Sequence, residues 1–147
     1  MFIKQLSVIL ENKKGALADW AGLMADNNVD LIACAIVDTG ETGTLRAVVN
    51  DPDTALELLR KAHYAATVTD VLAVVLLDRL GSLAEILALL RTHDICVEYF
   101  YPFMRQFEGD GVVVFRVNLP GAARALFEAH AIPMLSEEQL ATKTLKQ

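Results

Sequence analysis

The sequence predicts an α+β protein built from two ferredoxin-like βαββαβ repeats, each an antiparallel sheet with its helices on one face. Three observations lead to this fold class. Apolar, β-rich runs alternate with amphipathic helical segments in the order β-α-β-β-α-β. The same order then recurs, and the two copies align at a nearly constant shift. A split βαβ order of this kind folds into a four-stranded antiparallel sheet.

The first repeat is expected to span residues 1–70. Its helices are amphipathic, and Pro52 suits the first turn of the second one because proline is favoured there. A loop with two glycines between the middle strands is typical of a hairpin. The predicted segments are strands at 2–10, 30–38 and 44–50, helices at 14–27 and 51–63, and a long strand at 67–77.

The second repeat is expected to span residues 71–147. The strand at 67–77 is longer than an average strand, so it is interpreted as the last strand of one repeat running into the first strand of the next. The remaining predicted segments are helices at 81–93 and 121–130, strands at 97–106 and 112–118, a short strand near 132–135, and a last turn from Ser136.

The internal alignment supports the repeat. Residues of the first strand and the following turn recur 66 positions later, as with Leu6 and Leu72 or Gly15 and Gly81. Beyond the hairpin the shift becomes 68, so Asn50 meets Asn118. A hairpin two residues longer in the second repeat explains the change.

Composition excludes several function classes. The 147 residues are 54% hydrophobic and 22% charged, which is typical of a globular chain, and the net charge of −6 argues against a nucleic-acid surface. No apolar run approaches the roughly 20 residues of a membrane-spanning helix, and the N-terminus reads as a strand rather than a signal peptide. Cys34 and Cys96 lie in apolar runs without a CxxC motif, so we expect structural thiols, no membrane association and a cytoplasmic location.

The turn between the first strand and first helix of each repeat is the candidate site. Asn12 and Asp78 suit a helix N-cap or a turn, because their side chains accept backbone N–H bonds. Gly15 and Gly81 permit either an unusual dihedral angle or the close approach of another group. The turn also leaves N–H groups at a positive helix end, where a carboxylate or phosphate is stabilised.

Lys13 and Arg79 add a cation at matching positions of the two turns. The alternative interpretation is that any tight strand-to-helix connection favours these residue types, without a ligand. Spacing alone leaves both interpretations open.

The segments "NKKGAL" and "DRLGSL", each between an apolar strand and an amphipathic helix, resemble the turn of the ACT domain, which reads roughly Asp/Asn-x-Pro-Gly-x-Leu. The segments "GTLRAVVNDPDTAL" and "DICVEYFYPF" are similar to small stand-alone tandem ACT proteins, which usually have no catalytic domain. The resemblance covers residues 1 to about 140. The frequent proline of the family is Lys14 in one repeat and Leu80 in the other.

This resemblance implies a regulatory protein that binds a small molecule, most often an amino acid, between the turn of one ACT unit and the second strand of a neighbour. The turn would hold the α-carboxylate, and Glu98 or Asp78 would meet the α-ammonium group, since a buried zwitterion needs both charges paired. Arg46, in an otherwise apolar strand, is a candidate carboxylate clamp or part of an exposed strand face. The predicted ligand-binding residues are Asn12, Lys13, Lys14, Gly15, Ala16, Leu17, Leu31, Ile32, Arg46, Asp78, Arg79, Leu80, Gly81, Ser82, Leu83, Val97, Glu98 and Tyr99.

A homodimer is expected from the strand at 97–106, where apolar or aromatic residues occupy both faces. One face meets the helices, and the other would need a cover such as a second sheet. An aromatic ligand cage is the alternative. Pro102 also indicates an edge or a bulge in this strand.

No catalytic constellation is found. The chain lacks a Ser-His-Asp elbow, a P-loop and a Gly-x-Gly-x-x-Gly motif, and its three histidines have no partner at metal-ligand spacing. We therefore expect no enzyme activity, no cofactor and no metal. An acylphosphatase-like enzyme on the same fold is disfavoured, because the turn lacks the arginine and the glycines of a phosphate-cradling loop.

The expected partners are an amino acid and a regulated protein, since the chain has no effector domain. The alternative function is a structural or protein-interaction module with no small-molecule ligand. Such a module would present an exposed apolar patch for its partner.

Overall fold

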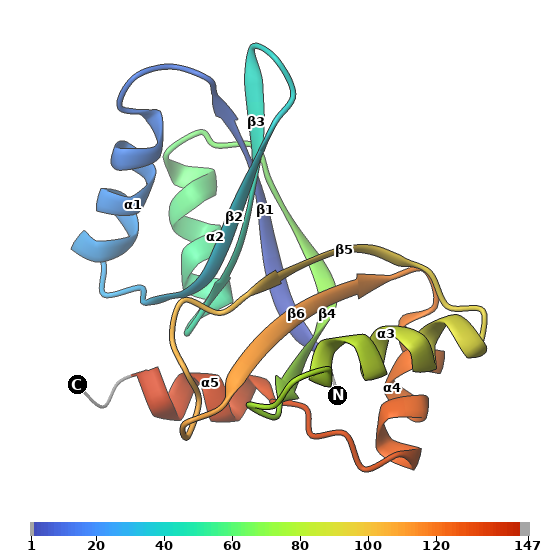
Figure 1. Ribbon diagram of the computed structural model, residues 1–147. Helices are drawn as coiled ribbons and strands as arrows, with labels where there is room; N and C mark the ends of the chain where they lie inside the picture. Colours follow the sequence, from blue (N-terminus) through green and yellow to red (C-terminus); the bar gives the residue numbers. More distant parts are fainter. Residues whose placement is uncertain (1, 145–147) are drawn as a thin grey trace. The chain divides into compact units, whose positions relative to one another are not determined.

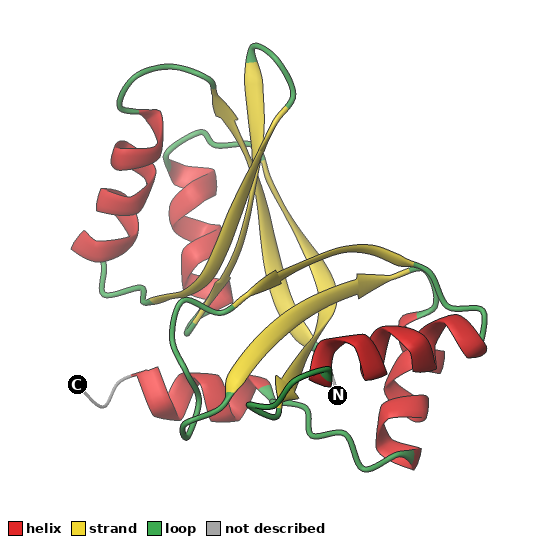
Figure 2. Ribbon diagram, in the orientation of Figure 1, coloured by secondary structure: helices red, strands yellow, loops and turns green. Residues whose placement is uncertain are grey.

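The computed structural model describes residues 2–144 and confirms the predicted α+β fold of two βαββαβ repeats. Figure 1 shows the elements in chain order, and Figure 2 separates helices from strands. Their bounds are β1 Ile3–Glu11, α1 Ala16–Asp26, β2 Leu31–Asp38, β3 Thr42–Val49, α2 Pro52–Lys61, β4 Ala66–Leu76, α3 Ser82–Thr92, β5 Val97–Pro102, β6 Gly111–Val117, α4 Pro120–Ala129 and α5 Glu137–Thr144.

The chain forms two compact units that do not follow the sequence order strictly. The first unit contains Lys4–Thr69 together with the described residues from Glu137 onward. The second unit contains Phe2 and Ile3 together with Asp70–Ser136. Strand β4 therefore serves both units, as the length of the apolar run predicted.

In the first unit the strand order is β2-β3-β1-β4, with β2 at an edge. Strands β1 and β3 are antiparallel, with Leu6 opposite Ala47 and Val8 opposite Leu45. Helices α1 and α2 lie side by side on one face of these strands (Figure 1). They bury Trp20, Met24, Ala55 and Leu59 against Leu6, Val8, Leu10, Leu45, Ala47 and Val49.

In the second unit, β6 lies between β4 and the edge strand β5. Leu72 faces Phe115 and Val74 faces Val113 across the antiparallel β4–β6 pair. The short strand expected near residues 132–135 is present as an antiparallel bridge between Val74 and Met134. Helices α3 and α4 bury Ile86, Leu90, Ala123 and Phe127 against Leu72, Val74, Val113, Phe115 and Val117.

Two predicted elements end elsewhere than the sequence indicated. Strand β5 stops at Pro102, whereas the apolar pattern predicted a strand to residue 106, because proline donates no ladder hydrogen bond. Of the edge or bulge expected from Pro102, the edge is confirmed, because β5 is an edge strand; its register shifts at the other end, between Val97 and Tyr99. The expected last turn from Ser136 is a helix of eight residues.

The homodimer expected from the two apolar faces of the strand at 97–106 stays a prediction. Val112, Val114 and Tyr101 are at most 5% exposed within the single chain, so their apolar character does not require a second copy. Phe100, at 45% exposure, stacks on Phe115 with ring centroids 5.7 Å apart. Among residues 2–144, no helix has both the length and the apolar character needed to cross a bilayer.

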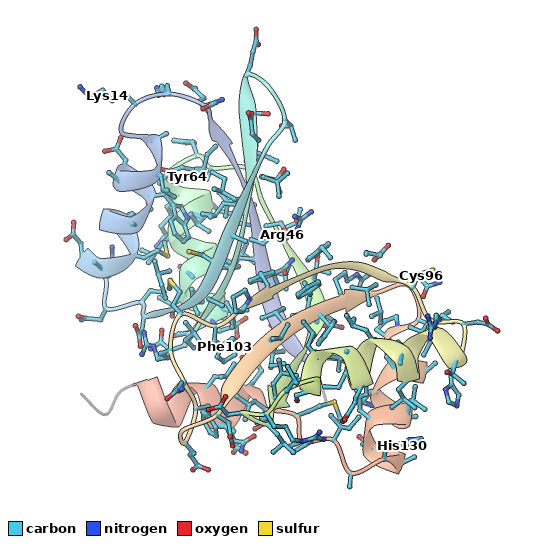
Figure 3. All side chains as sticks on the ribbon, in the orientation of Figure 1. Lys14, Arg46, Tyr64, Cys96, Phe103 and His130 are labelled. Carbon is cyan, nitrogen blue, oxygen red and sulfur yellow. The ribbon has the colours of Figure 1, made fainter. Side chains whose placement is uncertain are left out.

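The two cysteines are not joined in a disulfide, and they differ in environment. Cys34 is half-buried in β2, and burial raises the pKa of its thiol, which disfavours the reactive thiolate. Cys96 is exposed in the connection before β5 (Figure 3).

Candidate functional site

Both candidate turns have the same backbone geometry. Gly15 is the N-cap of α1 with φ of 87°, and Gly81 is the N-cap of α3 with φ of 85°. These left-handed conformations favour glycine over any residue with a Cβ. A Cβ built at either glycine meets no heavy atom of the described chain within 4 Å. The sequence allowed two explanations for these glycines, an unusual dihedral angle or the close approach of another group. The structure supports the unusual dihedral angle.

Asn12 and Asp78 are turn residues rather than caps, because neither helix has a side-chain cap. In the first helix, Ala16 N–H donates to Lys13 O at 3.3 Å and Asp19 N–H donates to Gly15 O at 2.9 Å. The N–H groups of Leu17 and Ala18 have no acceptor among residues 2–144. The first turn of a helix thus presents two donors at its positive end.

The second helix begins in the same way. Ser82 N–H donates to Arg79 O at 3.3 Å, and Glu85 N–H donates to Gly81 O at 2.9 Å. The N–H groups of Leu83 and Ala84 likewise have no acceptor in the described part of the chain. The repeat seen in the sequence is therefore a repeat of exposed backbone donors.

A groove of about 320 Å³ lies beside the first turn. Residues at the ends of β2 and β3 line this groove together with the turn, so the candidate site includes residues of the β2–β3 hairpin. Its lining residues are Leu10, Glu11, Asn12, Lys13, Ala16, Leu17, Ile36, Asp38, Thr42 and Gly43.

Beside the first groove, hydrogen bonds connect the turn to the β2–β3 hairpin. The Asn12 amide Nδ2 donates to Gly40 O at 2.9 Å and to Asp38 Oδ1 at 3.4 Å. Asn12 N–H donates to Glu41 O at 2.8 Å. Lys13 Nζ lies 3.0 Å from Glu11 Oε2, and the hydrogen bond to this carboxylate, followed by its charge, raises the pKa of Lys13.

A larger groove, of about 690 Å³, lies beside the second turn. The Asp78 carboxylate has no hydrogen bond or ion pair among the described residues. Arg79 donates to Glu85 through two bonds, of 2.8 and 2.7 Å, which raise the pKa of Arg79 and lower that of Glu85. The lining residues are Leu76, Leu77, Asp78, Arg79, Leu80, Gly81, Ser82, Leu83, Ala84, Leu87, Gln106 and Gly111.

Most of the predicted turn residues line these two grooves, with two exceptions in the first turn. Lys14 and Gly15 do not line the first groove, and Lys14 projects outward from the loop before α1 (Figure 3). Leu80 lines the second groove and is fully exposed.

The predicted binding residues of β2 and β5 do not line the groove beside the turn of their own repeat. Leu31 and Ile32 begin β2, at the end away from Ile36 and Asp38, and Ile32 is 1% exposed. Likewise Val97, Glu98 and Tyr99 begin β5 and line neither groove. Glu98 pairs with Arg116, with Oε1 and Nε 3.2 Å apart.

Arg46 lies in the middle of β3, opposite Ser7 of β1 and Ala35 of β2. Its neighbours Leu45 and Ala47 pack under the helices, so Arg46 is on the other face of the strands (Figure 3). It lines neither groove.

The contribution of the hairpins to both grooves was not predicted from the sequence. Ile36, Asp38 and Thr42 line the first groove, and Gln106 and Gly111 line the second. The two glycines of the first hairpin loop were the available signal, since a tight hairpin brings the strand ends to the turn.

Each turn also has a groove on its other side, toward the end of the second helix of its repeat. The volumes are about 350 Å³ in the first unit, where His63 is a lining residue, and 380 Å³ in the second, where His130 is one. His130 lies near His93, with ring centroids 6.4 Å apart. In the described part of the chain, no three histidine, cysteine or carboxylate side chains gather closely enough to hold a metal ion.

Comparison with known proteins gives one sequence family and several similar structures. The family described as an ACT domain pair matches residues 1–144. The crystal structure of protein BT0572 from Bacteroides thetaiotaomicron is 30% identical, covers 96% of both chains and has a TM-score of 0.89. No functionally curated protein matches the sequence.

Two more distant structures share the fold. The regulatory subunit of aspartate kinase from Thermus thermophilus, in a ligand-free form, is 14% identical over 86% of this chain and 91% of that chain, with a TM-score of 0.60. The corresponding subunit from Thermus flavus is 17% identical over 86% and 92% of the two chains, with a TM-score of 0.56.

Proposed function

The chain belongs to the family of ACT domain pairs, and we propose that it is a non-catalytic regulatory protein that binds an amino acid at its β1–α1-type turns. The observation that carries this proposal is the repeated turn. Twice, a glycine in the left-handed region begins a helix whose next N–H groups have no acceptor in the described chain, beside a partly apolar groove.

An amino acid matches the chemistry of these grooves. Its α-carboxylate accepts the N–H groups of the first helical turn, where the helix dipole favours negative charge. Its α-ammonium group is attracted to the carboxylates in the grooves, Asp38 in one and Asp78 in the other. An apolar side chain of the ligand would contact Leu10, Leu17 and Ile36 in the first groove. In the second groove it would contact Leu76, Leu83 and Leu87.

We propose further that a neighbouring ACT unit in a second copy of the chain completes each groove. Leu31, Ile32, Val97, Glu98 and Tyr99, which lie away from their own turns, are then contributed by that neighbour. Strands β2 and β5 are the two edge strands, and a sheet edge favours association with another strand. Arg46 remains a candidate clamp only in such an assembly.

Ligand binding then regulates by biasing assembly or the contact with a partner protein. A ligand that binds one arrangement more tightly than another shifts the population toward it by that difference in affinity. The regulatory subunits of aspartate kinase from Thermus thermophilus and Thermus flavus share this fold, which supports a role of this type.

A thermal-shift screen against the twenty amino acids and their related carboxylic acids tests the proposal. A ligand that binds only the folded state raises the melting temperature once its concentration exceeds the dissociation constant. We expect a shift confined to one chemical group of amino acids. A flat screen at high ligand concentration would contradict the proposal and favour a module that binds only other proteins.

A further inference from the structure

We propose that the second unit has a metal site at the ends of helices α3 and α4, where His93 and His130 bind one transition-metal ion through their Nε2 atoms. The fold brings these two residues together although they are far apart in sequence: their ring centroids are 6.4 Å apart, and the rings are inclined at 76°. His130 lies at the end of α4 (Figure 3). The ion would be a divalent one that imidazole suits, such as Zn²⁺, Ni²⁺ or Cu²⁺. This metal site does not require the amino-acid binding proposed above.

Hydrogen bonds fix which nitrogen of each ring is available to a metal. His93 Nδ1 lies 3.0 Å from Leu89 O, and His130 Nδ1 lies 3.0 Å from Leu126 O. A carbonyl oxygen can only accept, so each Nδ1 carries the hydrogen and each neutral ring has its lone pair on Nε2. Neither Nε2 atom has a hydrogen-bond partner among residues 2–144. Histidines that bind metals are oriented in this way, by donating the other ring N–H to a carbonyl or a carboxylate.

The separation of the two rings is compatible with one shared ion. Two imidazoles that bind a metal at N–metal distances of about 2.0–2.1 Å have centroids roughly 4.5 to 6.5 Å apart, depending on the angle at the metal. The observed 6.4 Å lies at the open end of this range. Both side chains are exposed, so a closure of about 1 Å toward a tetrahedral angle would not disturb the core.

The helix ends at this position favour a positive ion. His93 is the C-cap of α3 and His130 is the C-cap of α4, and the last carbonyls of a helix carry a partial negative charge. In the described part of the chain, no third histidine, cysteine or carboxylate joins the pair closely enough to be a ligand. Water would therefore complete the coordination, which is typical of an open, exchangeable site rather than a closed structural one.

The first unit shows that the fold itself does not need two histidines here. Its equivalent C-caps are Asn27 of α1 and Ala62 of α2. Asn27 Nδ2 donates to Leu23 O at 2.9 Å, just as His93 Nδ1 donates to Leu89 O, so an asparagine caps the helix in the same way. Capping alone does not account for an imidazole at both positions of the second unit. A bound ion would join α3 to α4 and would stabilise the second unit only.

Isothermal titration calorimetry with zinc chloride tests this inference on the full-length protein without a histidine tag. We expect one zinc ion per chain and a melting temperature that rises with zinc concentration, because the ion binds the folded pair. His93→Asn and His130→Ala place the residues of the first unit at these positions. Each variant should bind zinc about tenfold or more weakly, because one of the two protein ligands is lost.

His63→Asn is the matched control, because His63 has a left-handed φ of 64° that asparagine tolerates and belongs to the other unit. Cys96→Ser is a second control, since an exposed thiol is itself a zinc ligand. Both controls should bind zinc as the wild type does. Circular dichroism of each variant separates loss of binding from loss of fold.

Three results would overturn the two-histidine site. They are no zinc binding by the wild type, wild-type affinity in His93→Asn or His130→Ala, or an equal loss of affinity in His63→Asn or Cys96→Ser. None of these results bears on the binding of amino acids, which the thermal-shift screen measures separately.

Discussion

At the scale of single residues, the two N-cap glycines connect backbone strain with the candidate site. A valine at position 81 would hold a β-branched side chain at φ near 85°, which costs about 1–2 kcal/mol. A Cβ at this position meets no heavy atom of the described chain within 4 Å, so the Cβ itself adds no clash to this cost. Because a domain has about 5–15 kcal/mol of stability, the fold should survive.

We therefore expect Gly81→Val to lose ligand binding while it stays folded. The valine stands where the ligand carboxylate would approach the turn. Gly15→Val carries a similar strain, since φ is 87° there, and serves as the control for the folding cost. Calorimetry measures the ligand affinity of both variants, and thermal melting measures their stability. If Gly81→Val binds the ligand as tightly as the wild type does, the turn is not part of the binding site.

At the scale of elements, the cap of α2 makes part of the stability depend on pH. The Asp51 carboxylate accepts the Thr54 hydroxyl at 2.6 Å and the Thr54 N–H at 3.1 Å, and these bonds lower the pKa of Asp51. A carboxyl group whose pKa is lowered by folding stabilises the protein above its unfolded pKa, about 3.9. That contribution is lost as the pH falls through the lower, folded value.

Asp51→Asn isolates this effect, because asparagine caps helices about as well but does not titrate. We expect the free energy of unfolding of the wild type to fall relative to Asp51→Asn below about pH 4, and their difference to be constant between about pH 5 and 7. Urea unfolding of the wild type and of Asp51→Asn across this pH range measures the difference in their free energies of unfolding. Asp51→Ala should cost about 1 kcal/mol at neutral pH. A difference that does not change with pH would contradict the role of the Asp51 charge.

The elements also show how far the sequence could be read. The 66-residue shift, the alternating order and Pro52 were local signals, and the predicted strands and helices formed at those places. The position of Gly81 in the repeat likewise predicted a special turn. The hairpin bonds of Asn12 join residues 26 to 29 positions apart, which no local pattern reveals. The turn was therefore found from sequence, but its hairpin partners were not.

At the scale of the whole molecule, each end of the chain belongs to the unit formed mainly by the other repeat. Helix α5 belongs to the first unit, where Glu137 Oε1 accepts the N–H of Lys4 and Leu140 is 2% exposed. Phe2 belongs to the second unit, where the Arg124 guanidinium lies 5.1 Å from its ring centroid. Folding of each unit thus depends on a segment that is distant in sequence.

We expect Leu140→Ala to lower the free energy of unfolding by about 2–5 kcal/mol, because it removes a buried side chain from the first unit. Leu80→Ala is the control, since that leucine is fully exposed and its loss should cost less than about 0.5 kcal/mol. Urea unfolding compares the two. Equal costs would mean that α5 does not stabilise the folded chain.

Binding of an amino acid at the turns can be measured by NMR titration of the isotope-labelled protein with the amino acid that gives the largest thermal shift. We expect the largest amide shift changes at Gly81, Ser82, Leu83 and Ala84, where the helix presents its N–H groups. Changes confined to residues far from both turns, or no change at saturating ligand, would contradict it.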